Sequence, residues 1–262
     1  MFYSIIVRFQ AKEDIYFKYY PAEDWHGMLF NVMKIRDKEK TTVLHDDFQS
    51  KPFTISPIIP YLNWKEGERL LKAGRKHFVR VTFLEEEWYQ LFMEYFLFNP
   101  GNLKLNGGKI EVLEVLTNSK EHKKCKNVKP VELRKNARKK QKIKLKFHST
   151  TTFRVNKRHI IFPQAKYLFN SLLSKWKEFT DIKLEVTSKD FARINISRYE
   201  LESAMEQFKG YPMKGFRGFC EYELGYDLSD ENVKDINLLA DFAFYGGVGY
   251  KTTMGLGQVA RV

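Results

Sequence analysis

Histidines are the side chains in this chain best suited to acid–base chemistry, and there are six of them. The histidine pKa lies near neutrality, so such a residue can accept a proton or donate one at physiological pH. His45 stands in a polar stretch that we expect to be a loop, six residues before Lys51. His45 is therefore one candidate for an acid–base residue; the alternative is a surface histidine beside Asp46 and Asp47. The remaining histidines at strand edges or in basic surroundings are expected to be structural or merely phosphate-facing: His77, His122, His148 and His159.

A second candidate region is the stretch at residues 246–257, which has five glycines in twelve positions. Glycine weakens helix and strand interiors but adopts positive φ without strain, so we predict a loop. Such a loop can turn successive N–H groups towards an anion, and Lys251 beside two threonines suits phosphate. The alternative is an ordinary turn before a last strand. A Walker A loop is excluded because Tyr250 precedes Lys251, and a dinucleotide fingerprint because Thr252 stands where glycine is needed.

Positive charge is concentrated in one part of the chain. The 262 residues have a formal net charge of +13. Residues 120–146 carry thirteen positive and two negative side chains, which is +11 of that charge. We therefore expect a polyanionic partner, with nucleic acid first, and we interpret residues 121–144 as a basic linker that meets phosphates.

Other classes of protein fit the sequence poorly. No charged leader precedes an apolar run at the start, and no stretch approaches 18 apolar residues, so we expect no signal peptide, no membrane span and a cytoplasmic location. Cys125 and Cys220 are far apart and lie in no CxxC pair, so we expect reduced thiols. No Asp and Glu cluster has the spacing of metal ligands, and we expect neither metal nor cofactor.

Hydrophobic periodicity predicts the order strand, helix, strands, helix, strand in the first half of the chain, and the second half repeats this order. This is the order of a ferredoxin-like unit. We therefore predict an α+β protein with two tandem ferredoxin-like (RRM-like) domains, at residues 1–120 and 145–262. The glycine-rich loop would join the last helix to the last strand. The expected strands are 3–9, 78–83, 110–116, 145–155, 192–199, 218–224 and 258–262, and the expected helices are a four-turn helix from Pro21, 85–98, 164–179 and 230–244.

The glycine loop and three further runs resemble a known family. The loop has the pattern Gly-hydrophobic-Gly, five residues with a lysine, then Gly-hydrophobic-Gly, just before the last strand. This resembles the signature loop of the RAMP superfamily, and within it the CRISPR-associated repeat-RNA endoribonucleases of the Cas-six (Cas6) family. The supporting runs are KPFTISP at 51–57, STTTFR at 149–154 and KGFRG at 214–218.

The resemblance implies roles for particular residues. His45 would be the acid–base residue and Lys51 would steady the phosphate. The family has a tyrosine on the first helix, and the position that corresponds here is near Phe30, which has no hydroxyl. His26 lies one helical turn earlier and could take that role, or it could be a packing residue.

The resemblance also implies a partner and a reaction. The partner would be CRISPR repeat RNA, cut at one phosphodiester by 2′-OH attack without metal, leaving a 2′,3′-cyclic phosphate and a 5′-hydroxyl. The alternative is a non-catalytic RNA-binding RAMP subunit of a CRISPR interference complex. The protein would be a monomer or a homodimer, and other subunits of a CRISPR effector complex would be further partners. The expected RNA contacts are Lys214, Arg217, Gly247, Gly249, Lys251, Thr252, Gly255 and Gly257, with Lys157 and Arg158 as weaker candidates.

Overall fold

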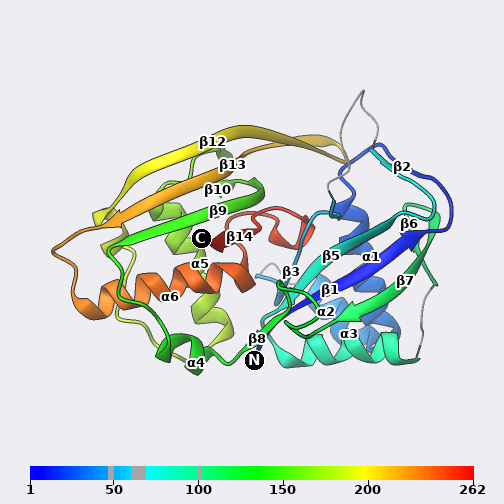
Figure 1. Cartoon of the computed structure of the whole chain (residues 1–262), viewed down its shortest axis with the longest axis horizontal. Helices are drawn as coiled ribbons and strands as arrows, with labels where there is room; N and C mark the ends of the chain where they lie inside the picture. The colour runs from blue at the N-terminus through cyan, green and yellow to red at the C-terminus, as the bar shows by residue number, and fades with distance from the viewer. Residues whose placement is uncertain (47–49, 61–68, 99–101) are drawn as a thin grey trace. The chain divides into compact units, whose positions relative to one another are not determined.

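The structure is a computed structural model of the chain, and it describes residues 1–46, 50–60, 69–98 and 102–262. It divides into two compact units. Unit 1 contains Met1–Asn127 and Gln207–Tyr211, and unit 2 contains Val128–Glu206 and Pro212–Val262. Each unit has its own main sheet and its own helices (Figure 1).

Unit 1 is built on a sheet with the strand order β3-β5-β1-β7-β6, and β8 also pairs with β1. The four strands β1, β3, β5 and β7 take the positions that a ferredoxin-like unit requires, with α1 and α3 as its two helices. A separate strand pair, β2 and β4, completes the unit. The elements are β1 (Phe2–Ala11), β2 (Ile15–Phe17), α1 (Ala22–Arg36), α2 (Lys38–Asp46), β3 (Phe53–Ile55), β4 (Arg69–Leu71), β5 (Lys76–Phe83), α3 (Glu86–Phe98), β6 (Asn102–Leu105), β7 (Gly108–Leu116) and β8 (Lys126–Val128).

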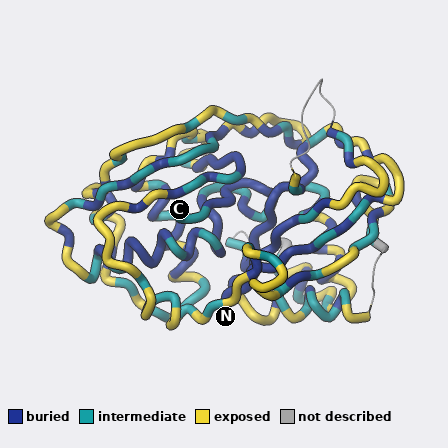
Figure 2. Tube along the Cα trace, viewed as in Figure 1, coloured by how far each residue is buried: buried dark blue, intermediate teal, exposed yellow. Residues whose placement is uncertain are grey.

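The core of unit 1 lies between the sheet and its helices. Trp25 and Met33 of α1 and Phe92 of α3 are buried against alternate residues of β1. Burial of each such side chain contributes roughly 1.5–3 kcal/mol, so this packing fixes both helices on the sheet. The other face of β1 is covered as well, because Ile6 packs against Cys125. Figure 2 shows this buried interior.

Unit 2 repeats the arrangement with the strand order β12-β13-β9-β14 and the helices α5 and α6. The prediction of two ferredoxin-like folds is thus confirmed. Strands β10 and β11 form a separate hairpin. The elements are α4 (Pro130–Lys135), β9 (Lys142–Thr151), β10 (Phe153–Val155), β11 (Arg158–Ile160), α5 (Ala165–Phe179), the 3-10 turn η1 (Asp190–Arg193), β12 (Ile194–Phe208), β13 (Tyr211–Leu224), α6 (Asp230–Gly246), the 3-10 turn η2 (Thr252–Met254) and β14 (Val259–Arg261).

The structure differs from the sequence-based elements in several places, and the predicted strand 145–155 is divided between β9 and β10. The polar stretch that we expected to be a loop around His45 forms the second helix, α2, as far as Asp46. Strands β12 and β13 are roughly twice as long as the predicted 192–199 and 218–224, and form one extended hairpin. The residues expected to be a basic linker contain β8, α4 and the start of β9. No helix within the described ranges is long and apolar enough to cross a membrane.

Candidate functional site

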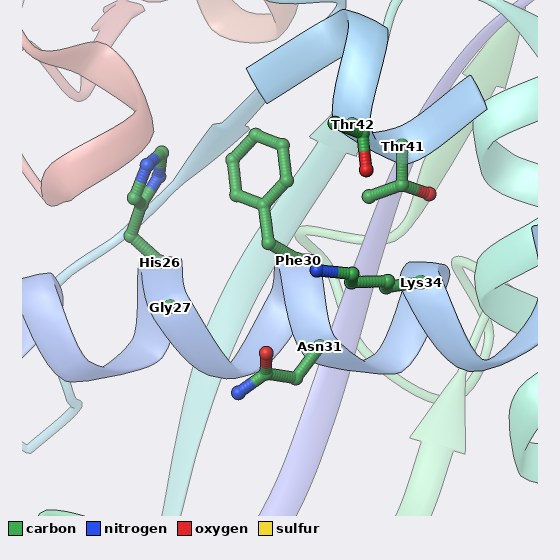
Figure 3. Close-up of a pocket in the computed structure, with 7 residues that line it drawn as sticks. All are labelled: His26, Gly27, Phe30, Asn31, Lys34, Thr41 and Thr42. Atoms are coloured by element: carbon green, nitrogen blue, oxygen red, sulfur yellow. The ribbon is translucent and has the colours of Figure 1, made fainter. Parts of the chain in front are cut away.

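A pocket of about 410 Å³ lies between α1 and α2 in unit 1. His26 and Phe30 are one turn apart on α1 and face it, and Thr41 and Thr42 approach from α2 (Figure 3). Spacing of four residues places side chains on one face of a helix, so α1 presents both rings together. The lining residues are His26, Gly27, Phe30, Asn31, Lys34, Thr41 and Thr42.

Aromatic packing fixes the position of His26. Its imidazole meets the Phe30 ring edge-on, with 4.9 Å between the ring centroids. The Phe53 ring of β3 lies 6.1 Å from the imidazole and is fully buried. His26 itself is half-buried. The imidazole therefore has a defined place beside the pocket, next to the Phe30 ring.

The second wall of the pocket, α2, is held by its first turn. The Asp37 carboxylate accepts a hydrogen bond of 3.0 Å from the N–H of Lys40, which caps the helix. The Lys40 ammonium forms an ion pair with Glu87 and lies 5.7 Å from the centre of the Trp88 ring, both on α3. The helix has a polar sequence with two threonines and a valine, and besides these contacts it buries Thr41 and packs Leu44 against the core of unit 1.

His45 and Lys51 meet at the C-terminal end of α2. His45 belongs to the last turn, and its side chain lies outside the described part of the structure. The Lys51 ammonium donates a hydrogen bond to the carbonyl of Leu44, the residue before His45. A cation at a helix C-terminus is stabilised by the helix dipole. The structure therefore brings Lys51 to the same turn as His45 across the six-residue separation.

The described residues contain no group of three or more His, Cys, Asp and Glu side chains arranged to hold a metal ion. The side chains that line the described pocket offer imidazole, amide, ammonium and hydroxyl groups.

The glycine-rich loop of unit 2 follows α6 and is held closely against its own unit. Its N–H groups bond to protein oxygens: Val248 to Gly257 O at 2.9 Å, Gly249 to Ser171 Oγ at 3.1 Å, Tyr250 to Thr152 O at 2.9 Å and Gly257 to Thr150 O at 3.0 Å. Thr150 and Thr152 belong to the STTTFR run noted in the sequence. That run serves as the surface on which the loop rests.

Two of the loop glycines are required by this packing. Gly249 has a φ of +82°, and a Cβ atom there would lie 2.3 Å from the Thr152 carbonyl oxygen. Gly257 has a φ of +65°, and its Cβ would lie 2.0 Å from the Val248 carbonyl oxygen. Both distances are too short for any L side chain. Four of the amides expected to face an anion are thus directed at the protein itself.

Lys251 and Thr252 occupy the middle of the loop. Lys251 has a left-handed backbone with a φ of 57° and is half-exposed. Its ammonium lies 3.1 Å from Met254 Sδ and 5.7 Å from the centre of the Tyr250 ring. Thr252 is buried instead, and its hydroxyl faces the interior of unit 2. Lys251 is therefore the more accessible of the two for a ligand.

The β10–β11 hairpin adds positive charge beside the loop. Its two-residue turn, Asn156 and Lys157, has positive φ at both positions, which matches a type I′ turn. Lys157 and Arg158 are exposed. Arg154 donates a hydrogen bond of 2.8 Å to the Tyr250 hydroxyl. The hairpin and the glycine loop are thereby joined through Tyr250.

Lys214 and Arg217 lie on β13, next to the threonine run. Phe216, between them, pairs with Thr151 of β9. Lys214 is exposed, while Arg217 is partly exposed with its Nε 3.4 Å from the Glu202 carboxylate. Unit 2 thus gathers several of the expected phosphate contacts around one end of β9.

Family models match both parts of the chain. The model of the CRISPR Cas6 N-terminal domain matches residues 1–129, and the model of the CRISPR-associated endoribonuclease Cas6 matches residues 145–259. The chain belongs to the Cas6 family. This confirms the resemblance carried by the glycine loop and its accompanying runs.

Known Cas6 proteins are similar to this chain in sequence and in structure. A CRISPR-associated endoribonuclease Cas6 from Streptococcus thermophilus is 25% identical over 118 residues, which is 43% of this chain and 47% of that relative. A product complex of Thermus thermophilus Cas6 aligns over 100% of both chains, with 23% identity and a TM-score of 0.86. A RAMP protein described as binding different RNA substrates aligns over 99% of both chains, with 14% identity and a TM-score of 0.65. These structures share the fold.

One residue of this Cas6 region was missed in the sequence. Lys175 of α5 is buried, and its ammonium donates hydrogen bonds to Gly246 O at 2.6 Å and to Thr252 Oγ1 at 3.0 Å. Burial lowers the pKa of Lys175 to about 8, and the nearby Glu178 carboxylate opposes this shift. Helical spacing could have revealed the residue, because Lys175 falls on the apolar stripe formed by Leu168 and Leu172.

Proposed function

We propose that this protein is a metal-independent endoribonuclease that cuts CRISPR repeat RNA at one phosphodiester. The observation that carries the proposal is the C-terminal end of α2, where the Lys51 ammonium reaches the carbonyl beside His45. That helix also forms a wall of the pocket that His26 lines. An acid–base group and a cation on one helix end are the groups that such a cleavage needs.

In the proposed reaction the 2′-hydroxyl attacks the adjacent phosphorus, and the 5′-oxygen leaves. His45 assists proton transfer, and Lys51 stabilises the additional negative charge of the phosphorane. His26 is the residue available where the family has a tyrosine, because its ring is held beside Phe30. The products are a 2′,3′-cyclic phosphate and a 5′-hydroxyl.

The glycine loop, the β10–β11 hairpin and β13 supply the proposed RNA-binding surface. Lys251, Lys157 and Lys214 offer ammonium groups to phosphates, with Arg158 and Arg217. Affinity for single-stranded segments then falls with salt at a slope of roughly −0.7 for each phosphate neutralised. The glycines act by letting the loop pack closely, so that Lys251 is presented from a fixed backbone.

The test uses the full chain and a repeat RNA from the same genome. We expect cleavage in excess chelator, with the two product ends named above. A matched RNA with 2′-deoxyribose immediately 5′ of the cut should bind with the affinity of the parent and resist cleavage, because only the attacking oxygen is missing. Cleavage of this deoxy RNA at the same bond, or loss of activity in chelator, would contradict the mechanism. Tight binding of the all-ribose RNA without cleavage would instead favour the non-catalytic RAMP subunit.

A further inference from the structure

Lys175 is a buried cation beneath the glycine-rich loop. The residue is 8% exposed, and it lies on the same face of α5 as the fully buried Leu172 and Trp176. Burying an ammonium is expensive, because the charge loses its water. The lowered pKa of Lys175, about 8, has this burial as its main cause. An apolar residue at this helical position would avoid that cost. The groups that accept hydrogen bonds from Lys175 therefore indicate what the lysine does there.

The two acceptors belong to different parts of the chain around the loop. Gly246 O belongs to the last residue of α6, where helix carbonyls lack partners within the helix. Thr252 Oγ1 belongs to the residue directly after Lys251, in the middle of the loop. One ammonium therefore ties the end of a helix to the centre of the loop that follows it.

The Thr252 side chain lies between Gly247 and Gly257, near the two ends of the loop. Its Cγ2 atom would lie 3.0 Å from a Cβ atom at Gly247 and 3.0 Å from one at Gly257. The residue is thus turned inward between the two ends of the loop. The preceding residue, Lys251, has a left-handed backbone and is partly exposed.

We propose that Lys175 is a positioning residue for RNA binding: by fixing Thr252, it holds Lys251 where it can meet a phosphate. The inference rests on the proposed RNA-binding role of the loop. Lys175 itself is buried and contacts no RNA. Its loss should therefore weaken RNA binding while the cleavage rate at saturating RNA stays near that of the parent.

The test compares three single variants with the same repeat RNA at a temperature well below unfolding. Lys175→Met removes the buried ammonium, and Thr252→Val removes its acceptor while keeping every charge. Lys177→Met is the matched control, because Lys177 is an exposed lysine on the same helix. We expect Lys175→Met to raise Kd about tenfold and Thr252→Val about threefold, with less than about a twofold change for Lys177→Met.

The salt dependence of RNA binding reports the number of phosphate contacts, and it distinguishes a positioning role of Lys175 from a role in stability alone. Lys175→Met should flatten the dependence of log K on log salt by roughly 0.7, as Lys251→Ala should, although Lys175 meets no phosphate. In the double variant Lys175→Met/Lys251→Ala the two losses should not add, because both remove the same contact. A structural role alone would lower Tm and leave the salt slope unchanged.

The outcomes for the loop and for Lys175 are distinct. Parent-like affinity and salt slope in Lys251→Ala would show that the loop does not bind RNA through this residue. Weakened binding in Lys251→Ala with parent-like binding in Lys175→Met and Thr252→Val would overturn the positioning role and leave RNA binding by the loop intact. If Lys175→Met does not fold, the affinity and salt slope of Thr252→Val decide.

Discussion

The pocket between α1 and α2 and the glycine-rich loop of unit 2 are specified in different ways. The loop is defined by its backbone: its amides bond to Thr150 and Thr152 carbonyls, and two of its glycines touch main-chain oxygens. The pocket is defined by side chains, with His26 against Phe30 on one helix and two threonines on the next.

The difference indicates which changes each region tolerates. A backbone-defined loop accepts many side chains at its exposed positions but no Cβ where main chain packs on main chain. A side-chain-defined pocket keeps its shape when one ring replaces another, which is consistent with phenylalanine at position 30. We therefore expect substitutions in the pocket region to change the cleavage rate, and substitutions in the loop to change affinity and stability.

The largest expected effect is that of His45→Ala. If this residue transfers a proton, the single-turnover cleavage rate should fall on the order of 10²–10⁴-fold with RNA affinity nearly unchanged. His122→Ala is a control for loss of an imidazole, since His122 packs against Phe78 with 5.2 Å between ring centroids. A His45→Ala rate within about threefold of the parent would shift the role to His26 or to positioning alone. The rate of the double variant His26→Ala/His45→Ala would separate these two.

Lys51→Ala should have the next largest effect on the rate. Loss of one group that stabilises charge in the transition state typically slows turnover by about 10²-fold. Affinity should change little, because the stabilised charge appears only during the reaction. Measurement of kcat and Kd on the same RNA tests this. A rise in Kd with an unchanged kcat would make Lys51 a binding residue. It would contradict the expectation that substitutions near the pocket change the rate and substitutions in the loop change affinity.

Gly257→Ala tests the backbone definition of the loop. Positive φ costs alanine roughly 1–2 kcal/mol, and contact with the Val248 carbonyl adds to this. Gly107→Ala is the matched control, because Gly107 has a φ of +82° with no atom within 4 Å of its Cβ position. We expect Gly257→Ala to lower the free energy of unfolding by at least about 2 kcal/mol more than the control does, and to weaken RNA binding. Equal losses of stability in the two variants, measured by denaturant unfolding, would show that close packing at Gly257 is unimportant.

The sequence by itself determined the order of the main strands and helices of each unit and the position of the loop. Apolar alternation in β1 and helical spacing in α1, α3, α5 and α6 reflect burial on one or two faces, which is a local property of the chain. The glycine spacing identified the loop and the Cas6 family, because positive φ and close packing leave glycine as the residue that fits.

Tertiary structure decided the features whose stabilising partners are distant in sequence. The α2 helix is polar and contains β-branched residues, and its partners are distant in sequence: Thr41 is buried, Leu44 packs against the core of unit 1, and Lys40 contacts Glu87 and Trp88 of α3. Local propensity contains no information about those contacts. The length of the β12–β13 hairpin could not be predicted from the sequence pattern either, because much of β12 is exposed and lacks a clear alternation of apolar residues.

The environment of single polar residues was also settled only by the fold. Lysine is a residue type that usually lies on the surface, yet the Lys175 ammonium is buried between a helix end and the loop. Thr252 has a hydroxyl of the kind that binds phosphate, yet this hydroxyl faces Lys175. Most buried polar side chains have hydrogen-bond partners that the fold supplies. The partners of Lys175, at positions 246 and 252, lie more than 70 residues from it in the chain.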